Sequence, residues 1–273
     1  MIKIFKYSTL GNHNYGWLKA KYHFNFANYF NPLIKPVKPL LVWNDDTISP
    51  KTGFPMHSHD NMEIITYIRK GKITHKDNLG NSGEIKSGQI QIMSAGTGIT
   101  HSEYNNTEEV TKLFQIWIEP NTLNIRPKWE NINIDNSNQK QIQILASGQN
   151  KYDKLKIPRI NQDVSLVRIK GKRNSINYDL GYKRQMYFVL SYGKVKINNL
   201  VVNESPYTIE FYVSVLPPPP APGDTDPGPG PSEPENLYAR IIINSNSYFG
   251  SKNLLHKFYT TNIRNYIKYP YLI

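Results

Sequence analysis

Residues 62–93 read MEIITYIRKGKITHKDNLGNSGEIKSGQIQIM, and this stretch decides the fold. Its β-rich runs MEIITYIR and QIQIM are separated by Gly71, by the turn-forming cluster DNLGN and by Gly88. Short strands bounded by glycine turns, with few helical patterns, predict an all-β chain built as an antiparallel barrel or sandwich. Further runs of the same kind are found at residues 72–75, 113–118, 164–169, 186–191 and 194–197.

A Gly-Lys pair follows an apolar run twice, first as Gly71-Lys72 and later as Gly193-Lys194. The surrounding residues, YIRKGKIT and LSYGKVKI, resemble one structural element used once in each half of the chain. This weak internal repeat predicts two related β-barrels in tandem. We expect an N-terminal barrel at residues 1–130 and a C-terminal barrel at residues 131–216.

The C-terminal part of the chain has a different composition. Residues 217–236 (PPPPAPGDTDPGPGPSEPEN) hold 9 of the 19 prolines, so we interpret them as an exposed, semi-rigid linker. Residues 237–273 form a basic, tyrosine-rich tail in which residues 238–244 (YARIIIN) are suited to a strand. We expect the C-terminal barrel to be incomplete, or to be completed at its edge by this strand.

Composition excludes several classes of site. The 273-residue chain contains no cysteine, which rules out disulfides, thiolate metal sites, iron–sulfur clusters and cysteine nucleophiles. Its net charge of +12 fits nucleic-acid or anionic partners as well as simple solubility. We favour solubility and do not expect a nucleic-acid partner. The sequence has neither a secretory signal nor an apolar run long enough for a membrane helix, so we expect a cytoplasmic protein without membrane contact.

The chemistry-bearing residues are histidines at alternating positions. His57 and His59 are separated by one residue, and His101 and Glu103 repeat that spacing in a second β-rich segment. Alternate side chains on a strand point to the same face. If the two segments lie on neighbouring strands, three imidazoles and one carboxylate converge. Such a set suits Fe, Mn, Co, Ni, Cu or Zn and leaves coordination positions open for chemistry.

Other interpretations of these residues stay open at this point. Paired histidines also occur on surfaces that bind no metal. Glu63 competes for the carboxylate role, because it has the same strand parity as His59. We interpret His75 as a histidine on the surface of a strand. Three further histidines have no partner at metal-ligand spacing, namely His13, His23 and His256.

The spacing of these residues resembles the two cupin motifs in a variant form, and more specifically the bacterial quercetinase branch of the pirin family. The most specific string is QIMSAGTGITHSE at residues 91–103, and the resemblance extends over roughly residues 1–200. Further strings that carry it are HFNFANYF at 23–30, VWNDD at 42–46, FPMHSH at 54–59, MEI at 62–64 and QIWI at 115–118.

The resemblance implies a bicupin, with two jelly-roll β-barrels and a metal ion in the N-terminal barrel alone. It implies one divalent transition metal, Fe(II) as the first choice, held by His57, His59, His101 and Glu103. Glu63 is not a ligand in pirins. The absence of histidine between His101 and His256 agrees with a single site.

The resemblance also implies a function, a metal-dependent quercetin 2,3-dioxygenase that takes a flavonol-like aromatic substrate and dioxygen. Glu103 is then the catalytic residue, which either accepts the proton of the flavonol hydroxyl or stays a ligand. Phe54, Met56 and Ile99 are candidates to bind the flat ring, although each also fits an ordinary barrel core. The alternative is a non-catalytic regulatory protein of the pirin type, which reports metal or redox state to a protein partner.

Overall fold

The structure, a computed structural model, describes residue 5 and residues 7–134, 141–170, 175–179, 184–191, 193–197, 200–204, 210–216 and 238–244. The described residues are almost entirely strands, with two short 3-10 helices, η1 (Tyr7–Thr9) and η2 (Asn150–Tyr152). The prediction of an all-β chain is confirmed. No helix among these residues has the length and apolar character needed to cross a membrane.

The chain divides into two compact units. The first unit consists of Lys6–Gln139 and Leu145–Val164, and the second of Met1–Phe5, Lys140–Ile144 and Ser165–Ile273. The expected linker at residues 217–236 and the end of the expected tail, from residue 245, lie outside the described residues.

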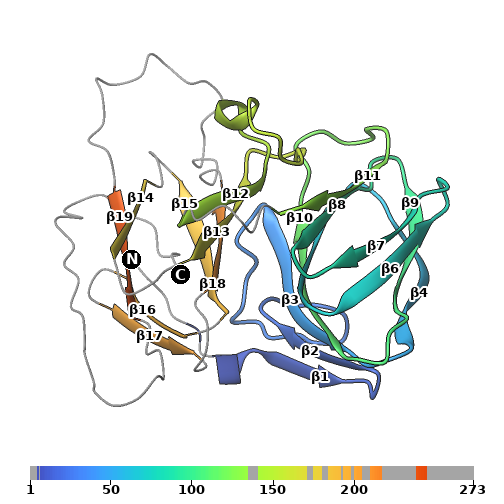
Figure 1. The fold of residues 1–273 in the computed structure, drawn as a ribbon, viewed down its shortest axis with the longest axis horizontal. Helices are drawn as coiled ribbons and strands as arrows, with labels where there is room; N and C mark the ends of the chain where they lie inside the picture. The colour runs from blue at the N-terminus through green and yellow to red at the C-terminus, as the bar shows by residue number, and fades with distance from the viewer. Residues whose placement is uncertain are drawn as a thin grey trace. The chain divides into compact units, whose positions relative to one another are not determined.

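The first unit is formed by two antiparallel sheets (Figure 1). Sheet I has the strand order β1 (Gly11–Asn14), β2 (Leu18–Tyr22), β3 (Leu40–Ile48), β10 (Thr111–Ile118), β5 (Glu63–Lys70), β8 (Gln89–Ser94) and β11 (Lys128–Asn133). Sheet II has the strand order β4 (Thr52–His59), β9 (Ile99–Asn105), β6 (Lys72–Asp77) and β7 (Ser82–Lys86).

A shared apolar core joins these two sheets. Ile68 and Leu113 of sheet I pack in one buried cluster with Ile73 and Ile85 of sheet II. The chain passes from sheet I to sheet II at Gly71, whose φ of 77° is readily adopted only by glycine. The expected glycine turn is therefore the point where the chain changes sheet.

Two further sheets are formed mainly by strands of the second unit, although the end of β12 (Ile142–Ser147), from Leu145, belongs to the first unit. Sheet III has the order β12, β13 (Ser165–Lys170), β18 (Glu210–Leu216) and β15 (Gln185–Leu190). Sheet IV has the order β14 (Ser175–Asp179), β19 (Tyr238–Asn244), β16 (Gly193–Ile197) and β17 (Leu200–Glu204). Between β15 and β16 the chain again changes sheet at the Gly-Lys pair, as it does between β5 and β6. The tail segment β19 pairs with both β14 and β16, an interior rather than an edge position.

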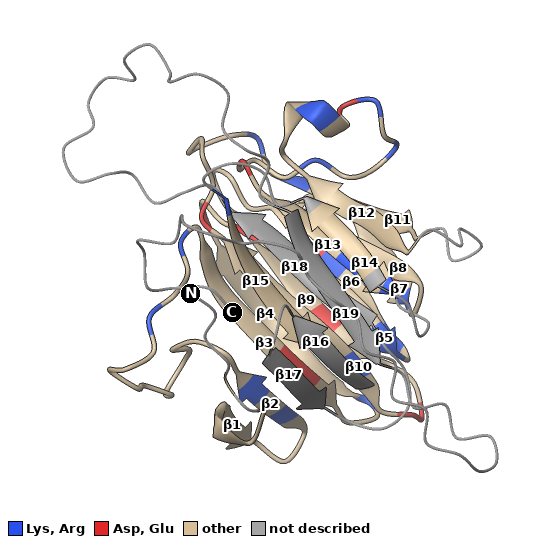
Figure 2. Cartoon of the chain, turned by 90° about the vertical axis from the view of Figure 1, so that its left-hand side faces the viewer, with Lys and Arg blue, Asp and Glu red and all other residues tan. Residues whose placement is uncertain are grey.

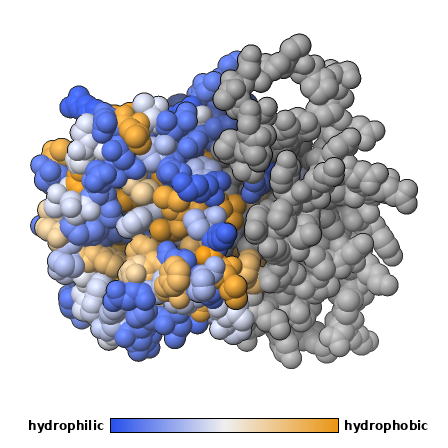
Figure 3. All heavy atoms as spheres, turned by 180° about the vertical axis from the view of Figure 1, so that it is seen from behind, coloured by the Kyte–Doolittle hydropathy of each residue, from blue (hydrophilic) through white to orange (hydrophobic). Residues whose placement is uncertain are grey.

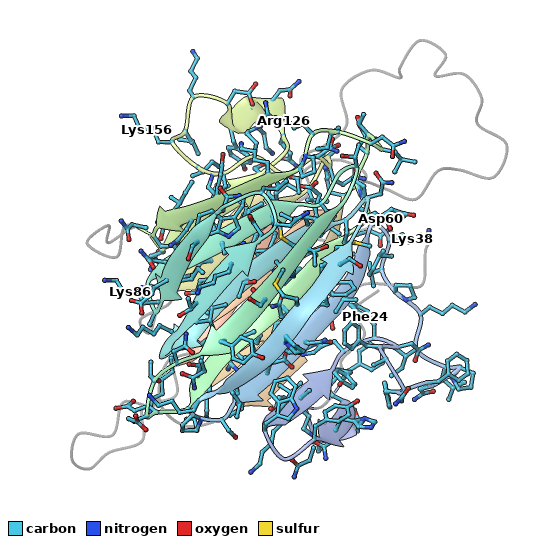
Figure 4. All side chains as sticks on the ribbon, turned by 90° about the vertical axis from the view of Figure 1, so that its right-hand side faces the viewer. Phe24, Lys38, Asp60, Lys86, Arg126 and Lys156 are labelled. Atoms are coloured by element: carbon cyan, nitrogen blue, oxygen red, sulfur yellow. The ribbon has the colours of Figure 1, made fainter. Side chains whose placement is uncertain are left out.

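Many of the basic side chains among the described residues lie at the surface. Lysine residues colour strand β2 blue in Figure 2, and hydrophilic and hydrophobic residues are interspersed on the coloured part of the face seen in Figure 3. The exposed cations Lys86, Arg126 and Lys156 extend outward from the sheets (Figure 4).

Candidate metal centre

A β-bulge aligns the two histidine segments. In the antiparallel pair of β4 and β9, Phe54 lies opposite Glu103 and His57 lies opposite His101, with a register shift between them. The one extra residue on β4 reverses its side-chain parity, so Phe54 and His57 face the same side of sheet II. Gly53 permits the close approach, because a Cβ atom there would lie 2.2 Å from the backbone oxygen of Glu103.

Three imidazoles converge on this side of sheet II. One potential ligand nitrogen from each of His57, His59 and His101 lies within 4.8 Å of the others. The ring centroids of His57 and His101 are 4.4 Å apart, and those of His59 and His101 are 5.1 Å apart. His57 Nδ1 lies 2.7 Å from the backbone oxygen of Pro55, which leaves its Nε2 for another partner. The two-residue spacing puts His57 and His59 on one face of β4, and the pairing of β4 with β9 brings His101 beside them, which fulfils the condition of the prediction.

Burial keeps two of these rings neutral. Burial, followed by the neighbouring imidazoles, lowers the pKa of His59 to about 4 and that of His101 to about 3. Neutral imidazole is the form that binds a metal ion. The Nε2 atom of His101 is buried and has no hydrogen-bond partner among the described residues. An orphaned nitrogen of this kind beside two more imidazoles fits a transition-metal ion.

Glu103 is held from the opposite sheet. Its Oε1 accepts hydrogen bonds from Thr66 Oγ1 at 3.0 Å and from Gln91 Nε2 at 2.8 Å, and its Oε2 accepts one from Gln115 Nε2. These three donors form a row across β8, β5 and β10, because Thr66 pairs with both Gln91 and Gln115. Sheet I therefore fixes the carboxylate that sheet II supplies.

A second group of potential ligands shares His101. One atom each of His75, His101 and Glu103 also lies within 4.8 Å of the others, and all three residues are buried. The interpretation of His75 as a surface histidine is wrong, since its exposed fraction is 0%. It lies opposite Glu103 in the β6–β9 pair and thus faces the interior between the sheets.

A cavity of about 140 Å³ contains the candidate ligands His57, His59, His101 and Glu103 in its wall. Three further polar side chains, from Asn44, Asp46 and Gln115, line it from sheet I. Burial raises the pKa of Asp46 well above its ordinary value, and Asp45 and Glu103 raise it further. The remaining lining is apolar and comes from Leu18, Tyr22, Phe26, Phe54, Ile64 and Trp117.

The other residues singled out in the sequence are distributed differently. Phe54 lines the cavity, whereas Met56 is 54% exposed and Ile99 packs in a core cluster with Ile64 and Met93. The cavity wall contains neither Met56 nor Ile99. Glu63 begins β5 in sheet I, where its carboxylate accepts hydrogen bonds from Ser94 and Asn161 rather than joining the imidazoles.

Several site residues were missed by sequence reasoning. Thr66, Gln91 and Gln115 are buried. The sequence signal that could have found them is a polar residue within an otherwise apolar strand. His75 and Asp77 carry the same i, i+2 spacing as the predicted ligands. Asn44 and Asp46 also follow that spacing, in the quoted string VWNDD.

Comparison with known proteins adds a family context. Residues 5–118 match the family model described as Pirin. The chain is 44% identical over 199 residues to a pirin-like protein of Caulobacter vibrioides, which is 72% of this chain and 85% of that relative. It is 36% identical over 209 residues to the quercetin 2,3-dioxygenase of Escherichia coli K12, which is 75% of this chain and 87% of that relative.

A solved structure resembles the chain over a similar length. The bacterial pirin YhhW of Escherichia coli in complex with nickel(II) has a TM-score of 0.72 and 32% sequence identity. The alignment covers 78% of this chain and 97% of YhhW.

Proposed function

The chain belongs to the pirin family, and from that premise we propose that it is a metal-dependent dioxygenase that opens the heterocyclic ring of a flavonol such as quercetin. The observation that carries the proposal is the convergence of His57, His59 and His101 at one cavity that Glu103 also lines. The name of the Escherichia coli relative supports the reaction class, and the nickel(II) bound by YhhW supports a divalent metal ion.

In this proposal His57, His59, His101 and Glu103 hold one divalent transition metal. Fe, Mn, Co, Ni, Cu and Zn all accept nitrogen and oxygen ligands of this kind, and Fe(II) is our first choice because the family resemblance implies it. A bound metal supplies a Lewis acid that lowers the pKa of a coordinated substrate hydroxyl. Because burial lowers the pKa values of His59 and His101, these two imidazoles are ready to bind it without first losing a proton.

Glu103 either accepts the proton of the flavonol 3-hydroxyl or stays a metal ligand. Its Oε2 accepts one side-chain hydrogen bond, from Gln115, and so keeps a lone pair for the metal or for that proton. Thr66 and Gln91 hold the other oxygen, Oε1, and thereby fix the orientation of the carboxylate in either role. Both roles keep Glu103 in contact with the reacting atoms.

The apolar wall receives the aromatic rings of the substrate. Phe54 and Trp117 line the cavity, and Trp117 makes an edge contact with the His59 ring at 4.9 Å. The cavity is smaller than the roughly 300–1,000 Å³ typical of sites that enclose drug-sized ligands. We therefore expect it to enclose only the metal-binding end of a flavonol. The roles of Met56 and Ile99 in substrate binding stay predictions.

The proposal is tested by the aerobic loss of the quercetin absorbance band after the full chain is loaded with Fe(II) or Ni(II). We expect turnover in the parent protein and none in the His57→Ala and His101→Ala variants. His13→Ala is a matched control, because His13 stacks on Tyr15 and is not itself part of the cavity wall, although its ring contacts Tyr22 of that wall. Full activity in both ligand variants would overturn the proposal. Tight metal binding with no turnover on any flavonol would instead favour the regulatory alternative.

A further inference from the structure

A line of three buried polar groups leads from a turn of sheet II to Nδ1 of His101, the ring nitrogen that is not assigned to the metal. His75 Nε2 lies 3.1 Å from Asp77 Oδ2, and His75 Nδ1 lies 3.4 Å from His101 Nδ1. The side chains of His75 and Asp77 have an exposed fraction of 0%. Only His101 of these three residues lines the cavity, so His75 and Asp77 act on the site through it.

Asp77 fixes the direction of the hydrogen bonds in this line. Its Oδ1 accepts hydrogen bonds from the backbone N–H groups of Leu79 and Asn81, and its Oδ2 accepts one from Asn81 Nδ2. A carboxylate surrounded by donors is an acceptor toward His75 as well. His75 Nε2 therefore carries a hydrogen, and in the neutral ring Nδ1 is left without one.

The bare Nδ1 of His75 determines the tautomer of His101. Two facing ring nitrogens at 3.4 Å form a hydrogen bond only if one of them carries the hydrogen, and here that must be His101 Nδ1. The Nε2 atom of His101 is then a bare lone pair. This is the atom that is buried without a hydrogen-bond partner among the described residues. Its lone pair is the form that a metal ion requires.

Packing holds the His75 ring in this orientation. The Trp129 ring stacks on it with centroids 4.9 Å apart and an interplanar angle of 14°. Gly83, which pairs with His75, leaves space for the indole, since a Cβ atom at Gly83 would lie 2.8 Å from Trp129 Cη2. Trp129 Nε1 also donates to Gln91 Oε1, so one indole supports both His75 and the donor to Glu103.

We propose that Asp77 and His75 are positioning residues, which hold His101 in the tautomer whose Nε2 is free to bind the metal. The inference rests on the proposed metal site and goes beyond its four ligands. It gives His75 an indirect role, in place of the direct ligation that its proximity to His101 and Glu103 would also permit. Partners of this kind are typically worth roughly 10- to 100-fold in metal affinity.

The first test needs no metal. Long-range proton–nitrogen NMR spectra of the metal-free full chain report which ring nitrogen of His101 carries the hydrogen. We expect the hydrogen on Nδ1 in the parent protein. In Asp77→Asn the amide retains an acceptor for the two backbone N–H groups but donates to His75, which reverses the line and moves the hydrogen of His101 to Nε2. A parent His101 with its hydrogen on Nε2 would overturn the inference.

The second test titrates Ni(II) into the same metal-free proteins by calorimetry. We expect Asp77→Asn and His75→Phe to weaken Ni(II) binding roughly 10- to 100-fold. His75→Gln should restore most of the affinity, because its amide can donate to Asp77 and accept from His101. Asn81→Ala removes one donor to Asp77 without reversing the line, so it is the matched control and should stay close to the parent protein.

The outcomes separate the inference from the proposed function. A parent protein that binds no Ni(II) contradicts the proposed metal site itself. Binding by the parent protein with unchanged affinity in Asp77→Asn and His75→Phe contradicts only the positioning role. If His75→Gln is as weak as His75→Phe, His75 acts as a ligand and the inference is wrong.

Discussion

His57 lies directly opposite His101 in the β4–β9 pair, although a regular ladder continued from Phe54 and Glu103 would put Met56 there. The bulge between Phe54 and His57 turns both side chains toward the cavity, while Met56 stays more than half exposed. The backbone conformation of β4 thus directs Phe54 and His57 toward the site and Met56 toward the solvent.

We expect Phe54→Ala to raise the KM for quercetin by roughly tenfold, equal to about 1.4 kcal/mol, because an apolar wall of the cavity is lost. Met56→Ala on the same strand should leave KM close to that of the parent protein. Steady-state kinetics of both variants, loaded with the same metal, check this. Equal losses in the two variants would assign Met56 to the substrate site after all.

The donors from sheet I should contribute to metal binding. Gln115→Leu and Gln91→Leu keep the side-chain volume but remove a donor to Glu103, so each should weaken Ni(II) binding roughly 10- to 100-fold. Gln89→Leu is a matched control on β8, since Gln89 bonds Asn133 instead. Calorimetric titration of the metal-free proteins measures the difference, and unchanged affinity in both site variants would contradict this role.

Glu63 should make stability pH-dependent. Burial raises its pKa to about 6 from its ordinary 4.5, so folding favours the protonated form. The stabilising contribution is complete below pH 4.5 and is lost as the pH rises through 6, a change of about 2 kcal/mol.

Glu63→Gln cannot lose a proton and should therefore gain about 2 kcal/mol relative to the parent protein between pH 4.5 and pH 7.5. Urea unfolding at both pH values measures this gain. Glu108→Gln provides the control, because the Glu108 side chain is 82% exposed. A pH-independent difference between Glu63→Gln and the parent protein would refute the assignment.

The strand β19 should stabilise sheet IV. Removing residues 217–273 takes away the strand that pairs with both β14 and β16, so the Tm should fall. Each kcal/mol lost lowers Tm by roughly 2–4 °C in a domain of about this size. Removing only residues 251–273 retains β19 and is the matched control. Identical melting curves for the longer truncation and the full chain would show that β19 adds nothing to stability.

The residue spacing was sufficient to predict the strands and which ligand candidates share a face, whereas the convergence of the three imidazoles also required β4 and β9 to be neighbours. Period-two alternation places His57 with His59 and His101 with Glu103 on one face whatever the rest of the fold does. The same rule failed for Glu63, because Asn61 has a φ of 42° and separates β4 from β5. Glu63 therefore belongs to a different sheet from His59.

Alternation alone could not tell which face is the interior. The run QIQIM suggests a half-exposed strand, yet Gln91 is fully buried because it bonds Glu103 and Trp129. His75 was assigned to a surface for the same reason. A strand whose polar side chains point into the interior alternates in the same way as a strand whose polar side chains point to solvent. The two cases differ only in which residues of the neighbouring strands and sheet face those side chains.

Thr66, Gln91 and Gln115 donate hydrogen bonds to Glu103, so they can change the properties of its carboxylate without being candidate metal ligands themselves. In the proposed metal site, substitutions in that row of donors change the basicity of the Glu103 oxygens while the four proposed metal ligands stay in place. The ion that the proposed site prefers would then change through mutation of a layer that never touches it.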